Sequence, residues 1–302
     1  MLEPSLNFVT CPDAKGSHRM AYWQWGAADS SHVIVCAHGL TRQGRDFDNL
    51  ARALCAAAPG KLRVVCPDVV GRGKSDWLQD PMGYSVPNYA ADMLVLLAQL
   101  QPKTLDWVGT SMGGLIGMVI SGQADLPLPV PVRRLVLNDV GPVLEWQAIQ
   151  RIGQYLGDTG RFETVQQAAD AIWAVSTSFG PHTPEQWLAL SIPMLKPLVD
   201  TVRGEPRGFT LNYDSGLAVP FAAATEASAK QSEALLWALY DNIKAQTLIT
   251  RGAESDLLSV ATASAMTQRG PKARLVEFAG VGHAPTFVAQ DQVETVVDFL
   301  LK

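Results

Sequence analysis

A serine lies between glycines at the point where a strand-like apolar run becomes a helix-like apolar run. The segment Gly109-Thr110-Ser111-Met112-Gly113 has the spacing G-x-S-x-G. A tight turn between strand and helix lifts such a serine above a sheet, and small residues two positions to either side let the strand and the helix approach closely. A serine hydroxyl needs a base to take its proton and donors to hold the oxyanion that its attack creates. The pattern predicts Ser111 as a nucleophile, with the backbone N–H of Met112 at the helix N-terminus facing the developing negative charge.

A nucleophilic serine needs a histidine base, and the base needs an acid that orients it. His283 lies in FAGVGHAPT, shortly after the strand-like residues 274–278. Asp256 lies in RGAESDLLS, shortly after the strand-like residues 246–250. The order serine, acid, histidine is the one in which this topology brings loops to the carboxyl ends of its strands. We therefore predict His283 as the base and Asp256 as the acid.

Two other carboxylates are alternatives for the acid. Asp139 directly follows the strand-like residues 134–138, and Glu254 lies two residues before Asp256. The Ser-Asp-Leu-Leu context favours Asp256 over Glu254. The remaining histidines are weaker candidates for the base because they lie in the predicted hairpin, in the insertion or at the end of an early strand: His18, His32, His38 and His182.

A phosphate-binding loop is the other interpretation of a glycine-rich turn between strand and helix. The segment around Ser111 lacks the G-x-G-x-x-G pattern and the lysine of a P-loop, and it does not follow the first strand. The sequence therefore argues against nucleotide binding.

The composition is that of an ordinary globular protein. Its 302 residues are 47% hydrophobic, and 24 Lys and Arg stand against 29 Asp and Glu for a formal net charge of −5. The chain is long enough to bury a large core. Because no long basic run is present, neither nucleic acid nor an anionic membrane is expected as a partner.

Cysteine usage and hydropathy bear on metal binding and on location. No C-x-x-C or Cys/His ligand spacing is present, so no metal is expected. The first residues lack a basic start followed by an apolar run, and no stretch approaches about 18 uninterrupted apolar residues. We expect a cytoplasmic protein with unpaired cysteines: Cys11, Cys36, Cys55 and Cys66.

Short runs rich in Val, Ile and Leu recur along the chain, and helix-like segments follow most of them. Runs without polar alternation indicate strands that are covered on both faces, as in a parallel sheet. The alternation of strands and helices predicts an α/β fold. The predicted strands are residues 32–37, 62–66, 105–108, 134–138, 246–250 and 274–278.

Two further segments depart from this alternation. Residues 7–10 and 20–26 are expected to form an antiparallel hairpin at one edge of the sheet. From Gly141 to about Asp241 the strand pattern fails, and helical spacing predicts a mostly helical insertion over one end of the sheet.

With Ser111, Asp256 and His283 in these positions, the sequence resembles the α/β-hydrolase superfamily, specifically its small bacterial serine hydrolases that carry a cap. The likeness extends over residues 20–140 and 243–302.

The resemblance implies a mostly parallel central sheet flanked by helices. It places the core in residues 1–140 and 243–302 and a helical cap in residues 141–242.

Two further motifs carry the resemblance. Residues 37–40, AHGL, look like the family's oxyanion loop, which implies the backbone N–H of Leu40 as the second donor beside Met112. Residues 67–76, PDVVGRGKSD, look like its P-D-x-x-G-x-G-x-S turn. We expect His38 to brace the oxyanion loop without transferring protons.

The resemblance implies a carboxylic ester hydrolase that works through an acyl-enzyme with no cofactor. A serine at position 111 differs from the aspartate nucleophile of epoxide hydrolases and haloalkane dehalogenases. The same elbow also occurs in hydrolases of lactones, enol-lactones and carbon–carbon bonds, so these activities stay open. A ligand-binding protein without catalysis is a further alternative, although such proteins usually lack a member of the triad.

The predicted substrate is a small, largely apolar ester, and the oligomeric state is left open. Arg42 is a candidate to hold a substrate carboxylate, although a solvated or ion-paired arginine is the more common case. Trp146 in the insertion and Leu257 beside the predicted acid are candidates for apolar contact with the substrate.

Overall fold

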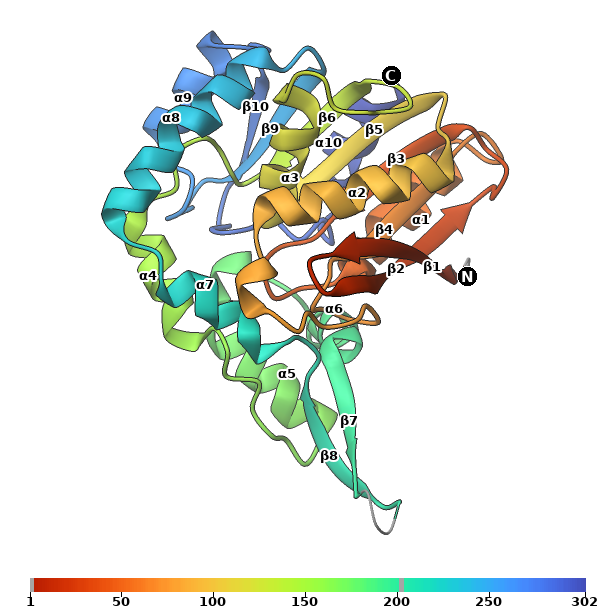
Figure 1. The fold of residues 1–302 in the computed structure, drawn as a ribbon, viewed down its shortest axis with the longest axis vertical. Coiled ribbons are helices and arrows are strands. Elements are labelled where there is room, and N and C mark those ends of the chain that lie inside the picture. The colour runs from red at the N-terminus through yellow and green to blue at the C-terminus, as the bar shows by residue number, and fades with distance from the viewer. Residues whose placement is uncertain (1–2, 201–203) are drawn as a thin grey trace.

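The computed structural model describes residues 3–200 and 204–302. Its centre is an eight-stranded sheet with the order β1-β2-β4-β3-β5-β6-β9-β10 (Figure 1). The pairs β1–β2 and β2–β4 are antiparallel, and all later pairs are parallel. The strands are β1 (Ser5–Asp13), β2 (Gly16–Gly26), β3 (His32–Ala37), β4 (Arg63–Asp68), β5 (Thr104–Thr110), β6 (Val132–Asn138), β9 (Gln246–Gly252) and β10 (Arg274–Phe278).

Helices cover both faces of the sheet (Figure 1). Two buried clusters reflect this arrangement, because one joins the sheet to α2, α3 and α9 and the other joins it to α1 and α10. The central strands are buried on both faces, which is why they read as continuous apolar runs. These helices are α1 (Asp48–Ala57), α2 (Val86–Leu100), α3 (Met112–Gly122), α9 (Val260–Gln268) and α10 (Gln290–Leu301).

The predicted architecture is confirmed. All six predicted central strands are present, and the expected hairpin is formed by β1 and β2 at the edge of the sheet. The antiparallel edge joins the parallel part through β2 and β4.

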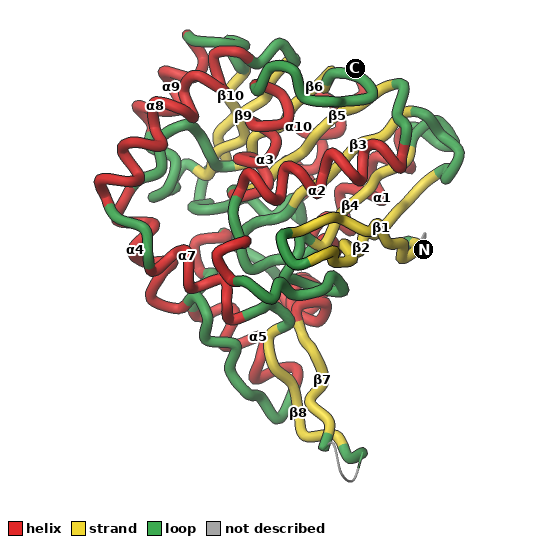
Figure 2. The backbone as a smooth tube through the Cα atoms, in the orientation of Figure 1, coloured by secondary structure: helices red, strands yellow, loops and turns green. Residues whose placement is uncertain are grey.

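Among its described residues, the insertion between β6 and β9 contains five α-helices and one antiparallel pair of strands. The pair projects away from the sheet in Figure 2. The sequence-based expectation of helices did not include these strands. The elements are α4 (Trp146–Tyr155), α5 (Val165–Ala174), α6 (Pro184–Ser191), β7 (Leu195–Val199), β8 (Pro206–Leu211), α7 (Ala218–Ala222) and α8 (Glu226–Asn242).

The last helix of the insertion returns to the core. α8 packs against α3 so closely that a Cβ at Gly122 would lie 2.0 Å from the carbonyl oxygen of Leu239. The segment 141–242 is therefore not separate from the core over its whole length.

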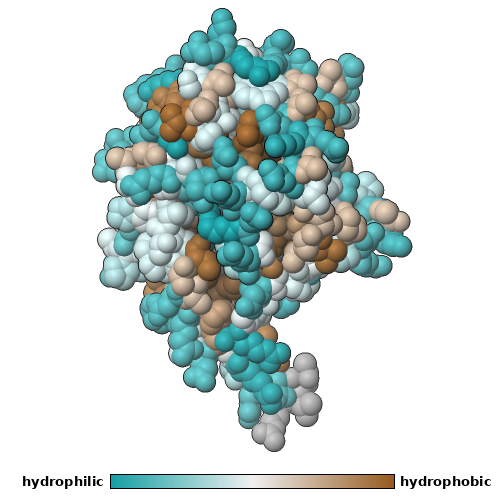
Figure 3. Space-filling model, turned by 90° about the vertical axis from the view of Figure 1, so that its left-hand side faces the viewer, coloured by the Kyte–Doolittle hydropathy of each residue, from teal (hydrophilic) through white to brown (hydrophobic). Residues whose placement is uncertain are grey.

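The side of the molecule that carries α4, α8 and α9 is mainly hydrophilic, with smaller apolar patches (Figure 3). Leu235 on α8 and Val260 on α9 are both 63% exposed. None of the helices in residues 3–200 and 204–302 combines the length and the apolar character needed to cross a bilayer.

Candidate active site

Ser111 lies at a sharp turn between β5 and α3. Its φ of +51° and ψ of −115° are unusual for a residue with a side chain. The turn requires glycine on both sides, because a Cβ at Gly109 would lie 2.2 Å from the carbonyl oxygen of Gly113 and one at Gly113 would lie 2.0 Å from that of Ala37. The G-x-S-x-G spacing thus reflects the close passage of helix and strand.

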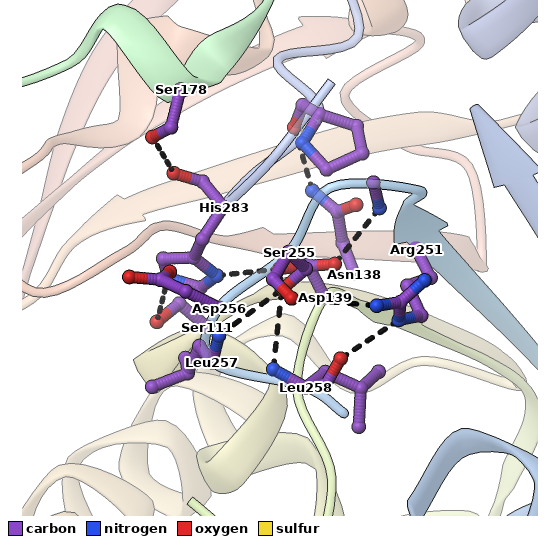
Figure 4. A network of polar contacts seen from close by, with 12 residues as sticks. Ser111, Asn138, Asp139, Ser178, Arg251, Ser255, Asp256, Leu257, Leu258 and His283 are labelled. Carbon is purple, nitrogen blue, oxygen red and sulfur yellow. Dashed lines mark hydrogen bonds and ion pairs between the residues drawn. The ribbon is translucent and has the colours of Figure 1, made fainter. Parts of the chain in front are cut away.

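The loop after β10 brings His283 to this serine. His283 Nε2 lies 3.0 Å from Ser111 Oγ, and its Nδ1 lies 2.7 Å from Oδ2 of Asp139 (Figure 4). The side chain of His283 is 10% exposed. Its backbone carbonyl accepts a hydrogen bond of 2.8 Å from the hydroxyl of Ser178 in the insertion. A hydroxyl, an imidazole and a carboxylate therefore form one chain of hydrogen bonds.

Asp139 directly follows β6 and is fully buried. Its Oδ1 accepts a 2.9 Å hydrogen bond from the backbone N–H of Gly252. Its Oδ2 accepts a 2.5 Å hydrogen bond from the hydroxyl of Ser255 in addition to the one from His283. These donors satisfy a carboxylate that burial would otherwise disfavour.

The prediction of Asp256 as the partner of His283 is wrong in the structure. The guanidinium of Arg151 binds its carboxylate through Nε–Oδ2 and Nη2–Oδ1 distances of 2.8 and 3.0 Å. The side chain of Asp256 is 47% exposed. Asp256 lies four residues past the end of β9 at Gly252, on a loop that turns toward α4 on the surface.

The two predicted oxyanion donors lie next to Ser111. The N–H of Met112 is the first of α3 and has no partner within its helix. Among the described residues, the N–H of Leu40 has no hydrogen-bond acceptor. Leu40 and Ser111 line the same two cavities, which brings the loop after β3 to the nucleophile.

The buried side chain of His38 holds the loop of Leu40. Burial lowers the pKa of His38 to about 3, so its imidazole is neutral. Its Nδ1–H donates to the carbonyl of Gly39 at 2.7 Å, and its Nε2 accepts from the N–H of Val69 at 2.9 Å. His38 therefore occupies the bracing position that the sequence predicts.

Arg72 connects the two oxyanion segments. It donates from Nε to the carbonyl of Leu40 at 2.8 Å, and its Nη2 lies 3.3 Å from the sulfur of Met112. Asp68, in the same motif, accepts from the N–H groups of Gly44 and Lys74. Burial raises the pKa of Asp68 to about 6. The P-D-x-x-G-x-G-x-S turn thus supports the site without contacting the hydroxyl of Ser111.

Two cavities meet at Ser111. We call them the cap cavity, about 290 Å³, and the apolar cavity, about 220 Å³. Leu40, Ser111 and Ile152 line both. The charged side chains of Arg42, Arg151 and Asp158 line the cap cavity, whereas no charged side chain lines the apolar cavity among the described residues.

The structure separates the three candidates for substrate contact. Leu257 is 2% exposed and lines the apolar cavity. Arg42 lines the cap cavity, but its guanidinium is bound by Asp46 at 2.6 and 2.8 Å. Trp146 begins α4 and lines neither cavity, which contradicts its selection as a substrate contact. At about 3.6 residues per turn, a residue five positions before Arg151 points in a different direction from the helix axis.

A sequence model described as "Alpha/beta hydrolase family" matches residues 34–299. The chain belongs to this family. This α/β hydrolase is 50% identical over 296 residues to a 3-hydroxybutyrate-oligomer hydrolase of Cupriavidus necator, with 98% of this chain and 97% of that protein covered. Family membership and this similarity confirm the predictions of the fold and of a hydrolase acting on ester bonds.

Solved structures agree with the fold of this α/β hydrolase. An α/β hydrolase from Novosphingobium aromaticivorans has a TM-score of 0.81 and 32% identity, with 99% of each chain covered. A putative hydrolase from Rickettsia typhi has a TM-score of 0.83 and 25% identity, with 98% of each chain covered.

Sequence reasoning missed several polar residues around the histidine. Ser255 donates to Asp139, and Asn138 donates to the carbonyl of Pro285 at 2.8 Å, beside the loop of His283. Asn138 has a detectable signal, because it is a polar residue that directly follows the apolar run 135–137 of β6. Ser255 has none, since a serine in a loop is common.

Proposed function

We propose that this protein hydrolyses the ester bonds of 3-hydroxybutyrate oligomers through an acyl-enzyme on Ser111. The observation that carries the proposal is the hydrogen-bonded chain of Ser111, His283 and Asp139 at the junction of two cavities. The substrate class is supported by the relative that is 50% identical over 98% of this chain and has that activity in its name.

Acylation needs one nucleophile, one base and an oxyanion site. Nε2 of His283 takes the proton of Ser111 as Oγ attacks the ester carbonyl carbon. The N–H groups of Leu40 and Met112 stabilise the oxyanion. The intermediate then collapses with cleavage of the bond to the alcohol oxygen, which receives the proton from His283.

Deacylation uses the same groups with water. His283 takes a proton from water as its oxygen attacks the acyl carbon, and then returns the proton to Oγ of Ser111 as the acid leaves. Asp139 accepts from Nδ1–H throughout, which fixes the tautomer of the histidine and stabilises the imidazolium. Each cycle consumes one ester and one water and yields one acid and one alcohol.

The cavities are consistent with this substrate class. Each unit of the oligomer carries one methyl branch and one carbonyl, so it is largely apolar with few hydrogen-bond acceptors. Cavities of about 290 and 220 Å³ on either side of Ser111 leave room for units on both sides of the scissile bond. We place the cap in residues 141–242, with the substrate between it and the core.

The test is the release of 3-hydroxybutyrate from its linear dimer and trimer by the purified protein, with Ser111→Ala as the matched variant. We expect the variant to lose a factor on the order of 10³ or more in kcat. A p-nitrophenyl ester series measures ester hydrolysis independently of the oligomer. If wild type and variant are equally inactive on all these esters, the proposal fails, and lactone hydrolysis, carbon–carbon bond hydrolysis or ligand binding takes its place.

A cytoplasmic location is also part of the proposal. All four cysteines are free thiols, three of them buried. Free thiols persist in a reducing compartment. Fractionation of the source cells with detection of this protein tests the location.

A further inference from the structure

We propose that Arg151 forms a carboxylate-binding subsite in the cap cavity, so that the enzyme recognises the free carboxylate end of its substrate. This inference rests on the proposed function and adds the orientation of the substrate chain. Arg151 lines the cap cavity and is bound to an exposed carboxylate, Asp256, that a substrate carboxylate can replace.

The two arginines that line the cap cavity, Arg42 and Arg151, differ in how readily a substrate carboxylate can bind them. The side chain of Arg42 is 9% exposed and forms a bidentate pair with Asp46 and a further hydrogen bond to the carbonyl of Leu190. Its remaining nitrogen, Nη1, is buried and has no hydrogen-bond partner among the described residues. Breaking a buried pair leaves an uncompensated charge, which is costly. A substrate carboxylate would therefore have to displace the carboxylate of Asp46 to bind both Nε and Nη2 of Arg42.

The partners of Arg151 are the exposed carboxylate of Asp256 and, on the same helix, the side chain of Tyr155. The side chains of Arg151 and Asp256 are 38% and 47% exposed. Such a pair contributes little to stability, because water competes for both groups. An incoming carboxylate can accept the same two hydrogen bonds in the planar geometry that guanidinium prefers, and Asp256 can return to water.

The helix that carries Arg151 separates the two cavities. Arg151 and Tyr155 on α4 line the cap cavity, Ile149 lines the apolar cavity, and Ile152 lines both. The apolar cavity contains no charged side chain among the described residues, so a carboxylate there would lose its hydration without compensation. A charged substrate end is thus directed to the cap cavity.

Asp158 is the acidic residue among the described residues that line the cap cavity. It is exposed, and its Oδ1 accepts from the N–H of Gly160 at 3.0 Å. A substrate carboxylate is disfavoured near this like charge, which leaves Arg151 as the position of the subsite.

The chemistry of the oligomer then fixes its direction. In a linear 3-hydroxybutyrate chain, the free carboxylate lies on the alcohol side of every ester bond. With the carboxylate at Arg151, the cap cavity holds the leaving alcohol and the apolar cavity holds the acyl group. The acyl-enzyme therefore has its acyl chain in the apolar cavity, beside Leu257 and Ile149.

The experiment compares substrates that differ only in this charge. The first pair is the linear 3-hydroxybutyrate dimer and its methyl ester, and the second is 3-acetoxybutyrate and methyl 3-acetoxybutyrate. For wild type we expect a kcat/KM ratio of acid to methyl ester of about ten or more in each pair. Arg151→Gln should lower that ratio about tenfold, and Arg151→Lys should retain part of it.

Two acidic residues provide matched variants. Asp256→Asn removes the carboxylate that competes for Arg151, so the acid-to-ester ratio should rise. Asp158→Asn removes a charge that does not contact Arg151, so the ratio should change less than for Asp256→Asn. Equal increases in both variants would show general electrostatics and overturn the subsite.

The orientation of the substrate is tested with an ester whose carboxylate lies on the acyl side of the scissile bond. Mono-p-nitrophenyl succinate carries its carboxylate on the acyl side and should be cleaved at least about tenfold more slowly than p-nitrophenyl butyrate. A wild-type ratio near one with 3-acetoxybutyrate, or a ratio unaffected by Arg151→Gln, overturns the inference. Activity on the acetoxybutyrate pair without activity on the dimer would instead contradict the proposed oligomer substrate and leave the subsite supported.

Discussion

Asp139 Oδ2 lies 2.7 Å from Nδ1 of His283, although Asp139 follows β6 and precedes the histidine by 144 residues. We predict that Asp139→Asn lowers kcat on p-nitrophenyl butyrate by a factor on the order of 10⁴, because the amide fixes the wrong tautomer of the base. Asp256→Asn should cost less than about tenfold, since Asp256 contacts Arg151 and not His283. Initial rates at saturating substrate measure both.

The paired variants distinguish the two carboxylates directly. A large loss of kcat in Asp256→Asn with little change in Asp139→Asn would show that Asp256 is the acid, as the sequence predicts. Circular dichroism of each variant controls for folding, because Asp139 is fully buried and Asp256 is half exposed.

The choice between Asp139 and Asp256 as the partner of His283 could not be made from the sequence. Both follow parallel strands, β6 and β9, that are neighbours in the sheet, so both loops arise at the same edge. Spacing along the chain places each within reach of a histidine after β10. The choice depends on backbone conformation: Asp139 has a φ of +55° and turns its carboxylate inward, whereas the β9 loop carries Ser255 inward and Asp256 outward.

The nucleophile and the fold were predictable because they depend on packing that restricts the residue types. A Cβ at position 109 would overlap the backbone of α3, and one at position 113 would overlap the backbone of Ala37 in β3, so only glycine fits at either position and the packing is visible in the sequence. Double burial likewise gives the central strands their apolar runs. The two cavities could not be predicted, because they depend on the direction of α4 relative to the sheet, which no local pattern records.

Ser255 is predicted to position the acid. Its hydroxyl donates to Oδ2 of Asp139 at 2.5 Å, and its loss leaves that oxygen with the histidine alone. We expect Ser255→Ala to lower kcat about tenfold with little change in KM, because Ser255 lines neither cavity. Ser255→Thr retains a hydroxyl and should recover most of the loss. A change confined to KM would contradict this role.

The apolar cavity is predicted to set the preferred acyl chain. Ile149→Phe fills part of its roughly 220 Å³ and should lower kcat/KM for p-nitrophenyl octanoate about tenfold relative to p-nitrophenyl acetate. Val175→Phe adds the same ring to the cap cavity and serves as the matched control. The octanoate-to-acetate ratio should stay near the wild-type value there. A larger fall with Val175→Phe would assign the acyl group to the cap cavity.

We predict that His18 contributes to the pH dependence of the free energy of unfolding. His18 lies in β2 and contacts Asp92 in α2. His18 Nδ1 lies 3.2 Å from Asp13 and its Nε2 lies 3.1 Å from Asp92. Burial alone lowers the pKa of His18, but the hydrogen bonds and charges of Asp92 and Asp13 outweigh it, so the pKa is raised above its ordinary value. The folded state therefore binds the proton more tightly than the unfolded state.

The sign of this linkage is testable by urea unfolding. The stabilisation from protonated His18 is fully present below the unfolded-state pKa of about 6.5 and is lost as the pH rises through the folded-state pKa. We expect the difference in free energy of unfolding between wild type and His18→Gln to be largest near pH 6 and to shrink by pH 9. His182 provides the opposite case, because burial lowers its pKa, and its difference from His182→Gln should fall as the pH falls below about 6.5. The same trend in both variants would show that neither histidine determines it, because their pKa values are shifted in opposite directions.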